Sequence, residues 1–148
     1  MDCVFCQVAA HQKQEEILYE DDLVMAFLDR FRQPSIGGHI LVIPRQHHEH
    51  LWDLPENLCG PLMRVARMAS KAVRDVLLCT GVRLWIANGH SAGQEIPHLH
   101  IHVLPCRSAL DRVMYLFPSL TGKRRLSDPA LAEMAGPIRT RIQSFGKT

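Results

Sequence analysis

The sequence predicts an α+β fold in which a mostly antiparallel sheet carries one long helix. Three observations lead to this prediction. Strand-like segments outnumber helical ones, short turns join several of these segments, and one long stretch repeats its apolar residues every three or four positions. A length of 148 residues is enough for a hydrophobic core, so we expect a single domain over 1–148.

The first strands are expected in the N-terminal third of the chain. Ile17–Glu20 has the composition of a short strand, and Asp21–Asp22 that of a tight turn. Leu23–Leu28 is a continuous apolar run of strand length. A loop containing proline, serine and glycines follows over Asp29–Gly38. The next segment, His39–Pro44, is rich in β-branched residues and is therefore a third predicted strand.

A long amphipathic helix is expected over Glu56–Leu78. Its apolar residues recur at spacings of three and four, at Leu58, Leu62, Val65, Ala69, Val73 and Val76. Its polar side carries basic residues, namely Arg64, Arg67, Lys71 and Arg74. Pro55 suits the first turn of this helix, and Gly81 lies just beyond its end.

The second half of the chain is expected to contain two more strands and a short helix. Val82–Ala87 alternates like a strand, Asn88–Glu95 is a glycine-bearing loop, and His98–Leu104 is another strand. After Pro105 the pattern weakens. Ala130–Ile142 predicts a short C-terminal helix that is interrupted at Gly136-Pro137.

The composition argues against several classes of protein. A formal net charge of +2 does not provide the concentrated positive surface of a nucleic-acid-binding protein, and we expect the basic run Lys123-Arg124-Arg125 to be a solvated loop. No segment approaches the ~18 apolar residues of a membrane span, and the N-terminus has no signal-peptide pattern. Five cysteines, an odd number, do not suit a disulfide framework. We therefore expect a cytoplasmic protein without a membrane or nucleic-acid partner.

The most informative segment is the expected histidine strand. Because strand side chains alternate, the imidazoles of His98, His100 and His102 should line one face, while the apolar residues between them enter the core. Imidazole exchanges protons near neutral pH and is also a nucleophile, so this pattern suits chemistry on a small anionic group. A metal site is the alternative, and Glu95 is the nearby carboxylate that could complete it.

Together with four upstream motifs, this segment resembles the histidine triad (HIT) family, and within it the bacterial nucleoside phosphoramidase branch. The triad motif is His98-x-His100-x-His102, followed by Pro105. The upstream motifs are Cys3-Val4-Phe5-Cys6, Ala26-Phe27-Leu28-Asp29, Gly38-His39-Ile40-Leu41-Val42-Ile43-Pro44 and Asn88-x-x-x-Ala92-Gly93-Gln94. The resemblance places a domain core at about 3–107, whereas the tail over 108–148 shows no family signature. It implies a five-stranded, mostly antiparallel sheet with one long helix and a short C-terminal helix.

The resemblance also implies a mechanism. In the family, the residue that matches His100 attacks the α-phosphorus of a nucleotide and forms a covalent nucleotidyl-histidine, which water or another acceptor then releases. The residue that matches His102 contacts the phosphate or the leaving group. The residue that matches His39 buttresses the triad, although a core histidine at a strand edge is the alternative for this position. No cofactor is required for the chemistry.

Nucleotide-binding residues are implied in the same way. Asp29 matches the acid that binds the ribose hydroxyls, with a turn-capping aspartate as the alternative. Asn88, Gly93 and Gln94 match the loop on the phosphate side, where a glycine lets backbone N–H groups approach an anionic oxygen. Glu95 departs from the small hydroxyl residue that we expect there. A carboxylate beside a phosphate is repulsive, so Glu95 either points away or alters which leaving group is accepted.

A structural zinc site is a further expectation. The spacing Cys3-x-x-Cys6 is typical of a metal knuckle, which needs two more ligands. The resemblance implies that His47 and His98 provide them, and His48 and His50 are nearby alternatives. Two buried cysteines without a metal are the other interpretation.

Three hypotheses about function remain at this point. The first is an enzyme that acts on AMP-linked substrates such as nucleoside phosphoramidates, adenylylated molecules or dinucleoside polyphosphates. The second is a nucleotide-binding regulator with little turnover, and the third is a hydrolase that uses all three histidines as metal ligands. The resemblance further implies a purine nucleotide as the partner molecule and a homodimer that pairs through the long helix and the adjacent strand.

Overall fold

The computed structural model describes residues 3–32, 37–111 and 124–146. Its elements, in chain order, are α1 (Val4–Ala9), β1 (Ile17–Glu20), β2 (Val24–Leu28), β3 (Phe31–Arg32), β4 (Ile40–Pro44), η1 (Leu51–Asp53), α2 (Glu56–Leu77), β5 (Gly81–Trp85), η2 (His90–Ala92), β6 (Ile101–Cys106), β7 (Arg124–Arg125) and α5 (Asp128–Phe145). Five strands form an antiparallel sheet in the order β1-β2-β4-β6-β5, and β3 pairs with β7. This confirms the predicted fold class. Within the described ranges, no helix has the length and apolar character to cross a membrane.

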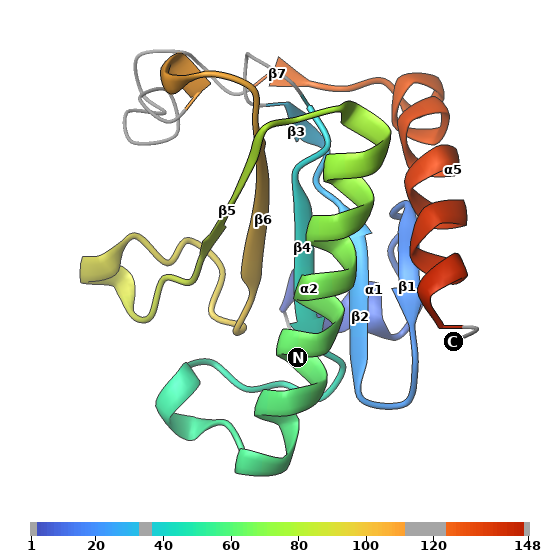
Figure 1. Cartoon of the computed structure of the whole chain (residues 1–148). Helices are drawn as coiled ribbons and strands as arrows, with labels where there is room; N and C mark the ends of the chain where they lie inside the picture. The colour runs from blue at the N-terminus through green and yellow to red at the C-terminus, as the bar shows by residue number, and fades with distance from the viewer. Residues whose placement is uncertain (1–2, 33–36, 112–123, 147–148) are drawn as a thin grey trace.

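The five-stranded sheet separates two hydrophobic cores. In Figure 1, α2 and α5 lie in front of the sheet and α1 lies behind it. On β2, Val24, Ala26 and Leu28 belong to the core in front, whereas Met25 and Phe27 belong to the core that contains α1. Because successive side chains of a strand point to opposite faces, β2 serves both cores. Coverage of both faces explains why this segment is apolar at every position.

The predicted strands before α2, and α2 itself, lie close to their expected positions. β1 has the expected bounds, while β2 and β4 each begin one residue later than expected. α2 ends at Leu77 because Leu78 adopts a left-handed conformation with φ of 52°. The buried face of α2 consists of Leu58, Leu62, Val65, Ala66, Met68, Ala69, Ala72 and Val73.

The predicted C-terminal helix is confirmed, but it is longer than expected and is not interrupted at Gly136-Pro137. α5 is continuous over Asp128–Phe145, a length of 18 residues, with Pro137 inside it. A proline in a helix interior costs about 3 kcal/mol. Burial compensates for this cost, because each fully buried apolar side chain contributes about 1.5–3 kcal/mol. The α5 side chains in the core shared with α2 are Leu131, Ala135, Ile138 and Ile142.

The histidine strand begins later than predicted. β6 covers Ile101–Cys106, rather than the expected 98–104, and includes Pro105. The three residues before it bond to a loop instead of a neighbouring strand, since the amide of Leu99 donates to the carbonyl of His48 at 2.6 Å. β5 also differs, because it covers Gly81–Trp85 rather than 82–87.

Two parts of the structure do not appear in the sequence prediction. α1 has only 6 residues, too few for an apolar period to be recognised. β3 lies inside the expected loop Asp29–Gly38, and its partner β7 is built from the basic run. Arg124-Arg125 is therefore a short strand rather than the predicted loop, although Arg125 is exposed as expected, and Lys123 lies outside the described residues.

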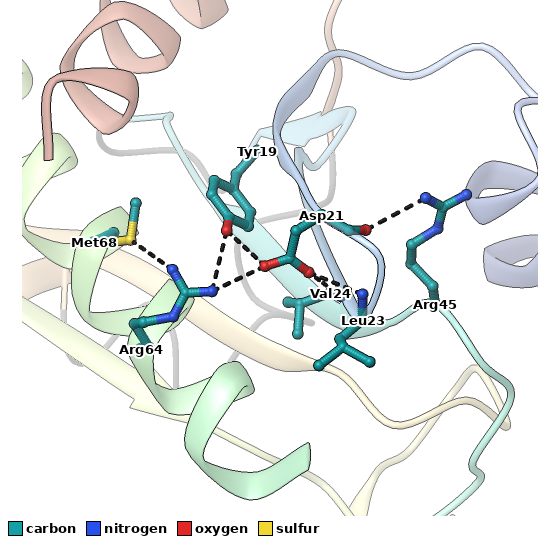
Figure 2. A network of polar contacts seen from close by, with 7 residues as sticks. All are labelled: Tyr19, Asp21, Leu23, Val24, Arg45, Arg64 and Met68. Atoms are coloured by element: carbon teal, nitrogen blue, oxygen red, sulfur yellow. Dashed lines mark hydrogen bonds and ion pairs between the residues drawn. The ribbon is translucent and has the colours of Figure 1, made fainter. Parts of the chain in front are cut away.

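A polar network attaches the β1–β2 turn to α2 (Figure 2). The Asp21 carboxylate accepts hydrogen bonds from the Tyr19 hydroxyl at 2.6 Å and from Arg64 of α2 at 2.9 Å. Its other oxygen accepts the amides of Leu23 and Val24 at 2.9 and 2.8 Å. Although partial burial opposes the charge, these hydrogen bonds lower the pKa of Asp21. The predicted tight turn thus also anchors the sheet to its helix.

Candidate functional site

The second and third histidines of the triad line one cavity. His102 lies on β6, and His100 immediately precedes this strand. Their ring centroids are 4.6 Å apart at an interplanar angle of 63°. Both side chains line a cavity of about 750 Å³, a size that accommodates a small-molecule ligand.

His98, in contrast, does not share this cavity. Its Nδ1 lies 3.4 Å from Cys3 Sγ and 3.6 Å from Cys6 Sγ. The expectation that all three imidazoles line one face is therefore wrong, because the backbone before β6 follows the loop rather than the pleat of the sheet. This geometry also argues against a cation held jointly by all three histidines.

His100 is held in the tautomer that a nucleophile requires. Its Nδ1–H donates to the backbone carbonyl of His98 at 2.6 Å, so a neutral ring carries its lone pair on Nε2. Burial lowers the pKa of His100, and the negative charges of Asp29 and Glu95 oppose this effect. The ring of Phe5 packs edge-on against His100, with centroids 5.2 Å apart. His100 is consequently neutral and oriented at neutral pH.

A chain of short polar contacts, an ion pair and a hydrogen bond, connects Asp29 with His102. One Asp29 carboxylate oxygen lies 2.8 Å from His39 Nδ1, and His39 Nε2 lies 2.9 Å from His102 Nδ1. An ionised carboxylate only accepts hydrogen bonds, so His39 Nδ1 carries a proton. The ring of Trp85 stacks on the ring of His102, with centroids 4.7 Å apart. These contacts leave Nε2 as the nitrogen of His102 that is available for substrate.

The loop before the triad contributes Gly93 and Glu95 to the cavity lining. Gly93 has φ of 84°, a left-handed conformation that favours glycine. Glu95 is exposed and lines the cavity together with His100 and His102.

Asn88 and Gln94 are absent from the described lining of the cavity and make structural hydrogen bonds. The Gln94 side chain accepts the amide of Gly89 at 2.6 Å and donates to the carbonyl of Glu49 at 2.8 Å. The Asn88 side chain accepts the amide of Leu51 at 2.6 Å. Both residues therefore brace the triad loop against the segment that precedes α2.

The remaining walls of the cavity differ in character. One wall is apolar and consists mainly of Val4, Phe5, Val8, Phe27 and Leu41. The other wall is charged or polar and consists of Lys13, Gln14, Glu15, Arg30, Arg125 and Asp128. None of these residues has a site role that the sequence predicts. The position of Phe5 between Cys3 and Cys6 could have indicated a place near the site. The residues of the charged wall have no local sequence signature.

Cys3, Cys6, His47 and His98 form a compact cluster in which all four potential ligand atoms lie within 4.8 Å of one another. The distance between Cys6 Sγ and His47 Nδ1 is 3.3 Å. Bonds of about 2.3 Å to sulfur and 2.0–2.1 Å to nitrogen place tetrahedral ligand atoms about 3.5 Å apart. The observed separations fit this geometry. Of the alternative ligands, His50 instead pairs with Asp53 at 3.0 Å.

The protonation of this cluster also fits a cation. His98 Nε2 donates to the carbonyl of Pro44 at 2.9 Å, which leaves Nδ1 free to coordinate a metal. Burial lowers the pKa of His98 to about 4 and keeps the ring neutral. Burial and the neighbouring Cys3 raise the pKa of the Cys6 thiol to about 11, whereas a divalent cation would favour the thiolate.

Comparison with known proteins agrees with this fold. The HIT domain family model matches residues 10–109. An uncharacterized HIT-like protein of Saccharolobus solfataricus is 38% identical over 103 residues, which are 70% of this chain and 73% of the relative. The crystal structure of a zinc-bound histidine triad family protein from Mycobacterium smegmatis has a TM-score of 0.79 and 27% identity, covering 99% of this chain and 97% of that one.

These matches establish the class as a HIT-domain protein with a histidine triad cavity. The chain belongs to the HIT family. A relative with an assigned activity is the adenylylsulfatase HINT3 of Arabidopsis thaliana, which is 34% identical over 104 residues, or 70% of this chain and 52% of that protein.

Proposed function

We propose that this protein is a nucleotide hydrolase or transferase that cleaves AMP-linked substrates at the α-phosphate. Its substrates would be phosphoramidates, adenylylated molecules or dinucleoside polyphosphates. The observation that carries the proposal is the arrangement of His100, whose Nδ1 is fixed at 2.6 Å from a carbonyl while its ring lines the cavity beside His102. The adenylylsulfatase relative supports a nucleotide substrate.

In the first step, His100 Nε2 attacks the α-phosphorus and the bond to the leaving group breaks. The leaving group takes the Nε2 proton of His102, which requires one extra proton on the His39–His102 pair. The Asp29 carboxylate stabilises that positive charge through His39 Nδ1, at 2.8 Å. A neutral His102 remains, with its Nε2 unprotonated.

In the second step, His102 Nε2 accepts a proton from water while the water oxygen attacks phosphorus. The phosphorus–nitrogen bond to His100 breaks and AMP departs. The His39–His102 pair regains the proton that it lost in the first step, so the cycle is balanced. A transferase reaction follows the same course with another hydroxyl compound in place of water.

The remaining site residues receive supporting roles in this proposal. The apolar wall takes the purine, Asp29 accepts the ribose hydroxyls, and backbone N–H groups near Gly93 approach the phosphate. Asn88 and Gln94 shape the phosphate-side loop. Glu95 faces the leaving-group side and influences which leaving group is accepted.

We also propose that the Cys3, Cys6, His47 and His98 cluster holds a structural zinc ion. The zinc-bound relative from Mycobacterium smegmatis supports this assignment. When bound, zinc would supply a closed four-ligand crosslink between the N-terminus and the segment before β6. The chain's own His98 carbonyl, 2.6 Å from His100 Nδ1, then keeps the nucleophile oriented. The chemistry itself needs no metal.

The test of the proposed function is His100→Ala, assayed with an adenosine phosphoramidate. We expect turnover to be lost while AMP binding stays close to that of the parent, because the nucleophile is removed while the other lining residues remain. Since His100 is buried, the melting temperature is measured to ensure that the variant is folded at the assay temperature. The matched control is His11→Asn, which changes an exposed histidine in a left-handed conformation that asparagine tolerates. Parent protein that is rapidly denatured at alkaline pH should carry the mass of one nucleotidyl group, because a phosphorus–nitrogen bond to histidine is labile in acid.

Two outcomes would contradict the proposal. Near-normal turnover of the His100→Ala variant would exclude the covalent mechanism. Tight AMP binding by the parent with negligible turnover on every AMP-linked substrate would instead indicate a nucleotide-binding regulator. Activity that persists after the cluster is stripped by a chelator, with the fold intact, separates this mechanism from metal-dependent hydrolysis.

We further propose that the HIT core and the tail act as one domain and that two chains form a homodimer. α5 contributes four residues to the hydrophobic core that it shares with α2, and this supports a single domain. β5 lies at an edge of the sheet, and Leu84 on β5 and Met63 on α2 are exposed. This combination supports pairing through the long helix and the adjacent strand, which the solution mass would test.

A further inference from the structure

The charged wall of the cavity is completed by a part of the chain that lies beyond the HIT match at residues 10–109. β7 pairs with β3 so that Arg125 lies opposite Phe31. The next amide, that of Leu126, donates to the carbonyl of Arg30 at 2.9 Å. These bonds place the Arg125 side chain in the cavity lining, next to the segment that follows Asp29.

The acidic residues of this wall are already paired. Arg30 Nε lies 2.8 Å from Glu15, and Arg30 Nη1 lies 2.5 Å from Asp128. Glu15 is well buried in this pair, with 8% of its side chain exposed. Among the described residues, no hydrogen bond or ion pair is found for the charged ends of Lys13 and Arg125, although the charge of Lys13 also acts on Glu15. The cations left available to a ligand at this wall are therefore those of Lys13 and Arg125.

This wall lies away from the reacting phosphorus. The α-phosphate of the proposed substrate is at His100, and the polar contacts from His102 to His39 and from His39 to Asp29 lead to Asp29, the proposed ribose acid. Arg125 is attached to the backbone directly after Asp29. A nucleotide that follows this path presents its ribose, and not its leaving group, to Arg125.

We propose that Arg125, together with Lys13, binds a second anionic group on the ribose of the substrate. The substrate class is then an adenosine 5′-conjugate that carries a phosphate on its 2′ or 3′ oxygen. A guanidinium fits phosphate in a bidentate manner, and a lysine adds a point charge. The Asp29 carboxylate would repel such a phosphate, and the two cations, Arg125 and Lys13, must outweigh this repulsion. This inference rests on the proposed function.

The experiment measures binding by calorimetry at about 50 mM salt, where charge interactions are only partly screened. The ligands are AMP, adenosine 2′,5′-bisphosphate and adenosine 3′,5′-bisphosphate. We expect the parent protein to bind one bisphosphate about tenfold more tightly than AMP, a typical gain for one charge-assisted contact. Arg125→Ala should remove this preference without changing the affinity for AMP, and Arg125→Lys should retain part of it.

The matched control is Arg67→Ala, which makes the same change of net charge on α2, across the sheet from the cavity. It should leave the preference unchanged. Equal affinity of the parent for AMP and both bisphosphates would overturn the inference while the proposed function stands, and so would a preference that survives Arg125→Ala. If none of the three ligands binds, the nucleotide cavity itself is refuted and the inference falls with it.

Discussion

Replacing His39 by alanine tests whether the Asp29–His39–His102 chain acts as a unit in catalysis. His39 is 6% exposed, and its two ring nitrogens lie 2.8 Å from Asp29 and 2.9 Å from His102. Alanine removes both contacts, so the Asp29 carboxylate loses the nearby imidazole of His39 and His102 loses the hydrogen bond to His39 Nε2.

The expected loss can be worked out from these contacts. A hydrogen bond to a charged group contributes about 1.5–3 kcal/mol, and leaving a buried partner unsatisfied costs about 1–3 kcal/mol. If about 2–3 kcal/mol of this is felt in the transition state, kcat falls about 30- to 160-fold. KM should change less than kcat, because His39 lines the cavity but is only 6% exposed.

The assay is single-turnover cleavage of an adenosine phosphoramidate by four proteins: the parent, His39→Ala, His102→Ala and the double variant. If the two histidines act through one chain, the double variant is no slower than His102→Ala alone. Additive losses, or an unchanged kcat for His39→Ala, would refute the reasoning. His39→Gln is the matched control, since its amide can donate and accept and should recover part of the rate. Melting temperatures are compared to ensure that all four proteins are folded at the assay temperature.

Three further predictions follow from the same geometry. Protein purified without added metal should contain a single zinc per chain, and Cys3→Ser should lose it and melt at a lower temperature; elemental analysis that finds no zinc in a stable parent would contradict this. Glu95→Ser should shift the ratio of the rates on a dinucleoside polyphosphate and an adenosine phosphoramidate about tenfold toward the polyphosphate, because removing the carboxylate relieves ~1–2 kcal/mol of repulsion; an unchanged ratio would make Glu95 a bystander. Because the pKa of Asp21 is lowered in the folded state, its contribution to stability is present above the ordinary carboxyl value of about 3.9 and is lost as the pH falls through the lower folded pKa. Asp21→Asn should therefore lower the unfolding free energy at pH 7 and flatten its dependence on pH in this acid range, and parallel curves for variant and parent would argue against the network.

The sequence alone was sufficient for the main sheet, the long helix and the family. Alternation and the three-to-four repeat report which side of an element is buried, and this information is local. It located β1 at Ile17–Glu20 and α2 to within one residue. The motifs also identified Cys3, Cys6 and His47 as candidate metal ligands, although the cluster that they form joins residues far apart in the chain.

The tertiary structure decided where the triad side chains point. The pattern His-x-His-x-His predicts one face, yet His98 turns to the cysteines because its neighbour Leu99 bonds to the carbonyl of His48 rather than to a strand. It also decided that α5 continues through Pro137, since burial against α2 offsets the lost hydrogen bond. Arg125 reaches the cavity only through the pairing of β7 with β3. Such contacts join residues that are distant in sequence, and no local periodicity records them.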